Sequence, residues 1–173
     1  LISIDGDGDA ECVSVAKSCN WPHGSFTVYS HSTNLGLQKH IEWCTGQYDQ
    51  ADGIIILEDD LTASPWMLHY CAAVLEAYSG DEMIAQFSLY APRVNEFTRI
   101  PFHPVCGPYD TYWAKVPSSW GQMYRPAAWQ AYQEHSETSN NDQSRAPAQI
   151  NAWSKSWKRD FFHYISATNK IVV

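Results

Sequence analysis

Short apolar runs alternate along this chain with longer stretches in which apolar residues recur every three or four positions. The clearest run is Gly53-Ile54-Ile55-Ile56-Leu57, where four large apolar residues in a row predict a strand that is buried on both faces. Shorter runs of this kind predict further strands at 1–4, 25–30, 84–88, 112–116 and 171–173.

The segments between these strands have helical spacing. Ser64 and Pro65 predict a helix start, with Ser as the N-cap and Pro in the first turn, and Gly80 predicts its end. Similar patterns predict helices at 10–19, 37–48, 126–137 and from 147 past 164, and loops at 89–111 and 138–146. Because strands alternate with helices, we expect one α/β domain over residues 1–173, with a mostly parallel sheet flanked by helices.

Three carboxylates, Glu58-Asp59-Asp60, follow the apolar run directly. The carboxyl edge of a parallel sheet is where α/β proteins bind their ligands. Like charges this close repel one another and favour a cation, a donor-rich ligand or a raised pKa. A hard divalent ion such as Mn²⁺ or Mg²⁺, shared with a bound phosphate, suits such a cluster.

Composition narrows the classes of partner. The net charge of −8, from 11 basic and 19 acidic residues, argues against nonspecific binding to nucleic acid or to a membrane surface. No apolar run approaches the roughly 20 residues of a membrane-spanning helix. Eight Trp and ten Tyr suit a core, with some left as stacking platforms for sugars or bases. The five cysteines show no zinc-ligand spacing and favour reduced thiols, with a Cys12–Cys19 disulfide as the alternative.

Five segments, in order along the chain, carry a resemblance to a known family. They are Leu1-Ile2-Ser3-Ile4-Asp5-Gly6, Asn34-Leu35-Gly36-Leu37, Lys39-His40-Ile41-Glu42-Trp43 with Gly46-Gln47, Ile56-Leu57-Glu58-Asp59-Asp60-Leu61, and Ser118-Ser119-Trp120-Gly121. Together they resemble GT-A fold glycosyltransferases, with relatives of N-acetylglucosaminyltransferase I and the inverting family-2-like enzymes most similar. Glu58-Asp59-Asp60 takes the place of the family's DxD metal motif.

The resemblance implies a transferase that moves a sugar from a nucleotide-sugar, a UDP-sugar in particular, to an acceptor hydroxyl with inversion. Asp60 would bind Mn²⁺ or Mg²⁺ directly. Glu58 and Asp59 would hydrogen-bond the ribose or metal-bound waters. The acceptor would be a glycan, a lipid-linked glycan or a protein, and the compartment the cytoplasm in a bacterium or the Golgi lumen in a eukaryote.

The remaining segments would complete the substrate site. By the same resemblance, Asp5 would accept a hydrogen bond from the base, Asn34 would belong to the nucleotide-sugar site, and His40 would contact the nucleotide. Trp120 and Gly121 would shape the pocket for the sugar and the acceptor.

The chain departs from the family in its general base, which an inverting transferase needs to take the acceptor's proton. Relatives carry an Asp beside a Trp near the last helix. Here one alignment places Asn151 at that position, and another places Ser154 or Lys155 there. The nearby candidates are Asp160, ranked first, then Asp142, with Glu137 and His103 behind them.

Two other functions stay open at this point. The missing base motivates an inactive GT-A-like domain that binds a nucleotide-sugar or a glycan. A phosphohydrolase with strand-end aspartates is a third class, although its downstream Lys is not found. The chain also starts and stops on predicted strands and lacks the family's opening strand and helix, so we expect a fragment that is incomplete at the N-terminus.

Overall fold

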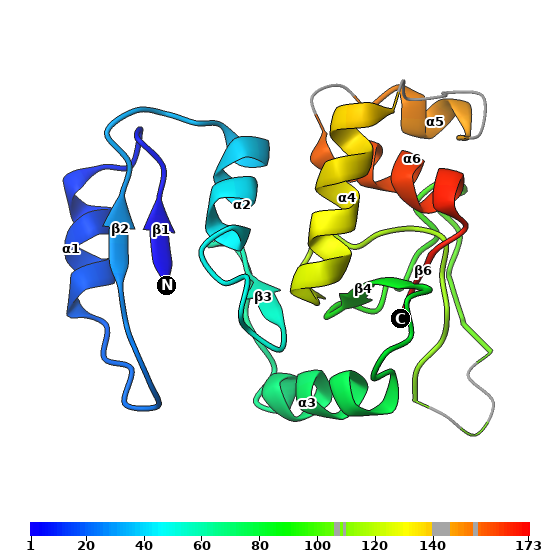
Figure 1. Ribbon diagram of the computed structural model, residues 1–173, viewed down its shortest axis with the longest axis horizontal. Coiled ribbons are helices and arrows are strands. Elements are labelled where there is room, and N and C mark those ends of the chain that lie inside the picture. Colours follow the sequence, from blue (N-terminus) through cyan, green and yellow to red (C-terminus); the bar gives the residue numbers. More distant parts are fainter. Residues whose placement is uncertain (106–107, 109, 140–145, 154–155) are drawn as a thin grey trace. The chain divides into compact units, whose positions relative to one another are not determined.

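The computed structural model describes residues 1–105, 108, 110–139, 146–153 and 156–173 (Figure 1). Its contacts divide the chain into two compact units, Leu1–Gln47 and Tyr48–Val173, which are described separately. The single domain expected over residues 1–173 stays a prediction.

The unit Leu1–Gln47 is a parallel strand pair with two helices. Strand β1 (Ile2–Ile4) pairs with β2 (Val28–Ser30), and Ser3 lies opposite Tyr29. Helices α1 (Ala10–Ser18) and α2 (Leu37–Thr45) follow one strand each. All four elements confirm the predictions for this stretch. Asp9 is the N-cap of α1, and its side chain accepts a hydrogen bond from the Cys12 amide over 2.8 Å.

The cysteines of the described residues are free thiols. Cys12 lies in the first turn of α1 and Cys19 is its C-cap, and both side chains are exposed. The two residues are seven positions apart along the helix, a rise of about 10 Å, which is too far for a disulfide. The Cys12–Cys19 alternative is therefore wrong for this structure.

The unit Tyr48–Val173 is built on a four-stranded mixed sheet. Its strands, in the order β3-β5-β4-β6, are β3 (Ile54–Ile56), β5 (Gln122–Tyr124), β4 (Ile84–Ser88) and β6 (Ile171–Val172). β5 runs antiparallel to both β3 and β4, whereas β4 and β6 are parallel. The α/β class is confirmed, but the mostly parallel sheet is wrong for this unit because the unpredicted strand β5 lies between two predicted ones.

The strand predicted at 112–116 is reduced to a single bridge, in which Ala114 pairs with Val172. The chain turns instead at Gly121, where a φ of 77° favours glycine, and β5 starts at the next residue. The predicted double-sided burial of 53–57 also fails for most of the run: Ile54 is buried, Ile55 and Ile56 are half-buried, and Leu57 is 44% exposed.

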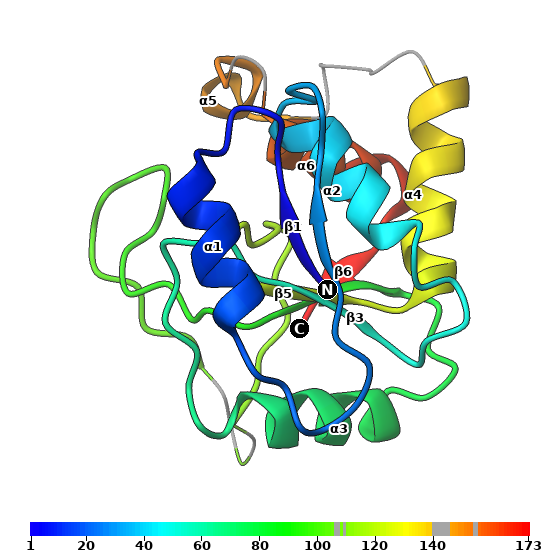
Figure 2. The same ribbon diagram turned by 90° about the vertical axis from the view of Figure 1, so that its left-hand side faces the viewer.

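Helices cover both faces of this sheet (Figure 2). On one face, Phe87 and Met123 pack with Cys71 and Val74 of α3 (Met67–Ala77). On the other face, the ring of Tyr124 contacts aromatic rings of α4 (Pro126–Thr138) and α6 (Trp157–Thr168). Alternation along β5 thus sends successive side chains into two cores.

The last predicted helix is divided in two. Ala148–Asn151 forms the short helix α5, and α6 starts at Trp157. Trp157 is buried and its ring packs on Phe161. Trp153 instead lies before α6 and stacks on Phe97, with ring centroids 6.5 Å apart. The helix start predicted at Ser64 is shifted as well, because α3 begins at Met67 and the Ser64 hydroxyl accepts from the Trp66 amide in the preceding turn.

None of the helices in the described ranges is long and apolar enough to cross a bilayer.

Candidate functional site

The acidic triplet lies just past the end of β3. Glu58 is partly buried, whereas Asp59 and Asp60 are exposed, and a turn joins the Leu61 amide to the Glu58 carbonyl over 3.2 Å. Burial raises the pKa of the Glu58 carboxyl, and the charges of Asp60 and Asp59 raise it further. The triplet is therefore a crowded negative site that a cation would relieve.

No three His, Cys, Asp or Glu side chains come together as a metal-binding group in the described part of the chain. A divalent ion at the triplet would depend on Asp60 together with oxygens from a ligand or from water. Such a coordination shell, with few protein ligands, suits Mg²⁺ bound to a substrate's phosphates. Asp60 as the metal ligand stays a prediction.

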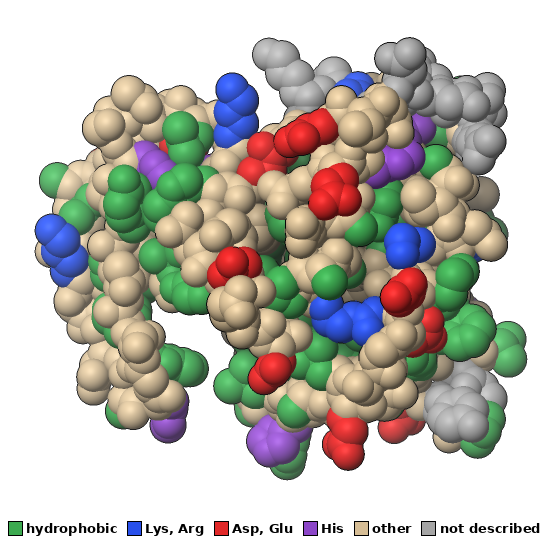
Figure 3. Space-filling view, in the orientation of Figure 1, with side chains coloured by type: hydrophobic (Ala, Val, Ile, Leu, Met, Phe, Trp, Pro, Cys, Tyr) green, Lys and Arg blue, Asp and Glu red, His purple; other side chains and the backbone are tan. Residues whose placement is uncertain are grey.

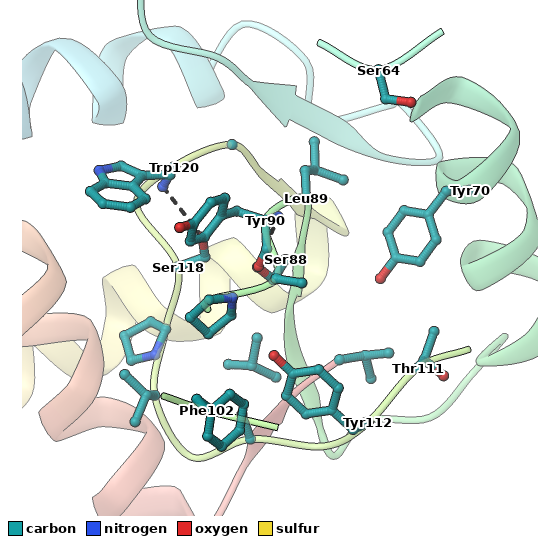
Figure 4. Close-up of a pocket in the computed structure, with 18 of the residues that line it drawn as sticks. Ser64, Tyr70, Ser88, Leu89, Tyr90, Phe102, Thr111, Tyr112, Ser118 and Trp120 are labelled. Atoms are coloured by element: carbon teal, nitrogen blue, oxygen red, sulfur yellow. Dashed lines mark hydrogen bonds between the residues drawn. The ribbon is translucent and has the colours of Figure 1, made fainter. Parts of the chain in front are cut away.

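A cavity of about 440 Å³ opens beside the triplet (Figure 4). Leu57 and Leu61, the residues on either side of the triplet, both line it. Its other large side chains are mainly aromatic: Trp66, Tyr70, Tyr90, Phe97, Phe102, Tyr112 and Trp120. Pockets of this size with apolar walls and a few polar groups are typical of small-molecule sites.

Trp120 and Gly121 line this cavity on the side nearest the triplet. Trp120 is 56% exposed, and its ring meets the edge of Tyr90 with centroids 4.8 Å apart. A Cβ atom placed on Gly121 would lie 3.2 Å from Leu89 Cβ and 3.4 Å from Leu57 Cδ2. The turn thus brings the predicted pocket residues against the end of β3, and their role toward a sugar stays a prediction.

A buried glutamine holds that turn in place. The fully buried Gln86 side chain accepts from the Ser118 amide over 2.7 Å and donates to the Ser118 carbonyl over 3.0 Å. It also donates to the Tyr124 hydroxyl over 2.6 Å. Sequence reasoning missed this residue, although a Gln inside the apolar strand 84–88 is itself a signal of a buried polar contact.

Hydroxyl groups supply most of the polar lining. Figure 4 shows the hydroxyls of Tyr70 and Tyr112 pointing toward the middle of the cavity, with Ser88 between them and Ser118. Burial, with smaller contributions from Cys71, Tyr78 and Tyr112, raises the pKa of Tyr70 to about 12. Its hydroxyl therefore keeps its proton near neutral pH and can donate a hydrogen bond.

Among the described lining residues, two carry a charge. Glu96 accepts from Lys158 Nζ over 2.7 and 2.8 Å. Asp110 is exposed, and no hydrogen bond or ion pair joins it to another described residue. Sequence reasoning missed Asp110, because it lies in an irregular segment without a motif.

The candidates for a general base lie elsewhere. None of the described ones belongs to the cavity lining: Asp160, Asn151, Glu137 and His103. Asp160 sits in the first turn of α6 and accepts from Arg159 Nε over 3.0 Å, and Asn151 ends α5. Asp142, Ser154 and Lys155 lie outside the described residues.

In the unit Leu1–Gln47, Asp5 organises the loop before α2. Its carboxylate accepts from the amides of Gly6 and Leu35 over 2.8 Å each, and from Gly36 over 3.0 Å. The Leu35 hydrogen bond is the main cause that lowers the pKa of Asp5, and Gly6, Gly36 and His40 lower it further against the effect of desolvation. Asn34 lies beside this turn and donates to Asp7 Oδ2 over 2.7 Å.

His40 belongs to a polar cluster in the same unit. Its Nε2 lies 2.6 Å from Ser3 Oγ, and His31 Nε2 lies 3.3 Å from the same oxygen. Burial lowers the pKa of His40; Asp5 raises it and His31 lowers it. The structure thus gathers Asp5, Asn34 and His40 in one unit, and the triplet with Trp120 and Gly121 in the other.

No known family model, curated protein or solved structure matches the chain. Its function therefore rests on the residues of these two groups.

Proposed function

We propose that the chain is part of a GT-A-type glycosyltransferase, which uses Mn²⁺ or Mg²⁺ and transfers a sugar from a UDP-sugar to an acceptor hydroxyl with inversion. The observation that carries the proposal is the junction of the acidic triplet with an aromatic-walled cavity, whose described lining has no basic side chain and two acidic ones, Glu96 and Asp110. Leu57 and Leu61, which flank the triplet on either side, both line the cavity.

The lining of the cavity suits a sugar better than a phosphate. A sugar ring has apolar C–H faces, which pack on aromatic rings, and a rim of hydroxyls. Aromatic side chains and the hydroxyls of Tyr70, Ser88 and Ser118 match both features. The described lining contains no Lys, Arg or His to neutralise a diphosphate. The leaving diphosphate would instead lie at the triplet, where a bound divalent ion stabilises its charge.

Asp60 and its neighbours would have distinct roles there. The exposed Asp60 carboxylate would hold the ion. Glu58, whose pKa is raised by burial, Asp60 and Asp59, would gain most from a nearby positive charge. Figure 3 shows acidic side chains scattered over the visible face of the unit Tyr48–Val173 without a broad basic patch, which fits a small-molecule donor rather than nucleic acid.

We assign the general base to Asp110. An acceptor hydroxyl must lose its proton to a carboxylate or a similar group as it attacks the sugar. Asp110 lines the cavity, and no described residue pairs with it, whereas Glu96 is already held by Lys158. The acceptor proton would move to the Asp110 carboxylate as the acceptor oxygen bonds to the anomeric carbon of the sugar, and the bond from that carbon to the diphosphate oxygen would break to release UDP.

Within the unit Leu1–Gln47, Asp5, with Asn34 and His40 near it, stays our candidate for contact with a nucleotide base. A carboxylate offers about four acceptor positions. Three main-chain amides occupy Asp5, which leaves room for one further donor such as a uracil N–H.

An inactive domain that binds a nucleotide-sugar or a glycan is the second candidate. The observation in its favour is that Asp160 and Asn151, which lie where relatives carry their base, do not line the cavity. Slow release of UDP from a UDP-sugar separates the two candidates, because only the active enzyme cleaves the bond to the sugar.

Titration calorimetry with UDP tests the donor site. We expect binding in Mn²⁺ that EDTA removes and that Asp60→Ala abolishes. Asp52→Ala is the matched control, since Asp52 is an exposed carboxylate just before the start of β3, whereas the triplet follows its end. The Asp52→Ala variant should bind UDP as the wild type does. Equal UDP affinity with and without the ion would contradict the proposal.

A further inference from the structure

We infer that the acceptor carries an uncharged apolar group beyond its sugar, as an alkyl or aryl glycoside does, and that the far end of the cavity binds this group. The inference rests on the proposed function, because it takes the triplet as the place where the donor sugar is released.

The cavity has two ends. The near end adjoins the triplet and is formed by Leu57, Tyr90 and Trp120. The far end is formed by Phe102 and Tyr112, whose rings lie 5.7 Å apart, and by Val94 and Phe97. Figure 4 shows Phe102 and Tyr112 on the opposite side of the cavity from Trp120. An acceptor that reacts at the near end must extend its remaining body toward these rings.

Apart from the Tyr112 hydroxyl, the far end offers few polar groups to a second sugar. Its amide side chain, Asn95, already accepts from the amides of Phe97 and Thr98 over 2.9 and 3.0 Å. Its carboxylate, Glu96, is paired with Lys158. A polar group placed there would lose its hydration with few new hydrogen bonds, whereas an apolar group would gain free energy.

The wall of the far end is already in place. Val94 pairs with Pro101, and the Phe102 amide donates to the Arg93 carbonyl over 2.9 Å, so the segment folds back on itself. Phe97 stacks on Trp153, and Glu96 ties the same turn to α6 through Lys158. A preformed apolar wall binds a chain without paying the entropy of ordering itself.

The test compares methyl and hexyl glycosides of the same sugar, below the concentration at which hexyl glycosides form micelles. The sugars are β-D-glucose, β-D-galactose, β-D-N-acetylglucosamine and α-D-mannose, and saturation-transfer NMR measures the dissociation constants in the presence of UDP and Mn²⁺. For at least one sugar we expect the hexyl glycoside to bind at least tenfold more tightly than the methyl glycoside, because each buried methylene contributes about a fourfold gain in affinity. Equal dissociation constants for the methyl and hexyl glycosides of every sugar would overturn the inference.

Two surface valines give a matched pair of variants. Val94 lines the cavity and is 45% exposed, whereas Val105 is 96% exposed and does not line it. Val94→Ser should weaken the binding of the hexyl glycoside severalfold and leave the affinity for the methyl glycoside unchanged. Val105→Ser should change neither affinity. If both variants change the affinity for the hexyl glycoside equally, the preference for the hexyl group comes from nonspecific contact, and the inference is overturned.

These outcomes separate the inference from the function on which it rests. If the protein prefers hexyl glycosides, loses that preference in Val94→Ser and does not bind UDP, the proposed transferase function is wrong and the cavity is a site for apolar ligands. UDP binding that depends on Mn²⁺, without a hexyl preference, would support the transferase and overturn the inference.

Discussion

Gln86 and Ser118 are joined by two hydrogen bonds across 32 residues of sequence, one in each direction between the glutamine amide and the serine main chain. The pair fixes the start of the turn that carries Trp120 to the cavity. Gln86 is fully buried and Ser118 is partly buried.

We predict that Gln86→Leu lowers the free energy of unfolding by about 2–3 kcal/mol, since it removes the hydrogen bond to the fully buried Tyr124 hydroxyl and both bonds to the partly buried Ser118 main chain. Urea denaturation measures the change. Gln130→Leu, an exposed Gln on α4, is the control and should alter stability little. A Gln86→Leu protein as stable as the wild type would show that the turn does not need this contact.

Two glycines with the same backbone strain differ in their surroundings. Gly80 and Gly121 have φ values of 75° and 77°, but a Cβ on Gly80 would meet no atom within 4 Å, whereas one on Gly121 would press on Leu89 and Leu57. We expect Gly80→Ala to cost about 1 kcal/mol from strain alone. Gly121→Ala should cost about 2 kcal/mol and also weaken ligand binding, because the added methyl overpacks against Leu89, which lines the cavity. Equal costs in thermal unfolding would contradict this difference.

The raised pKa of Glu58 predicts a pH dependence with a definite sign. A carboxyl that holds its proton more tightly in the folded state stabilises the fold fully below its ordinary pKa of 4.5. That stabilisation is lost as the pH rises through the raised value. Glu58→Gln should therefore raise the melting temperature at pH 7 and have little effect at pH 4.

Adding Mn²⁺ and UDP should narrow the difference between Glu58→Gln and the wild type at pH 7, because a bound cation offsets the repulsion among the three carboxylates. A melting temperature that falls at pH 7 in Glu58→Gln would show that the charge of Glu58 stabilises the fold.

Asp110→Asn should reduce turnover by about 10²- to 10⁴-fold, the usual contribution of a general base, with UDP affinity unchanged. Glu76→Gln, an exposed carboxylate on α3, serves as the control and should retain full turnover. Loss of UDP binding in Asp110→Asn would place this residue in the donor site instead.

Local patterns predicted most elements and the position of the triplet. The strand 84–88 and the helix from Pro126 are where apolar spacing and a proline start placed them. β5 was missed because Gln122-Met123-Tyr124 is too short to show a period, and it becomes a strand through its pairing with β3 and β4. The break before α6 was missed because it depends on the stacking of Trp153 on Phe97, two residues that are 56 positions apart in sequence.

The residues of the candidate site also fall into those that local sequence predicts and those that only tertiary contacts bring together. A strand-end argument needs residues that are adjacent in sequence, and it placed Glu58-Asp59-Asp60 correctly at the end of β3. Gln86, Asp110 and the Phe102–Tyr112 wall come to the cavity from separate segments. Only the folded chain brings them together.

Release of UDP from a panel of UDP-sugars in Mn²⁺ tests the central claim most directly. The wild type and Asp52→Ala should release UDP from at least one of them in the presence of the ion, and Asp60→Ala or EDTA should stop the release. Release at the wild-type rate from Asp60→Ala, or no release from any UDP-sugar by the wild type, would contradict the assignment of the triplet and its cavity to sugar transfer.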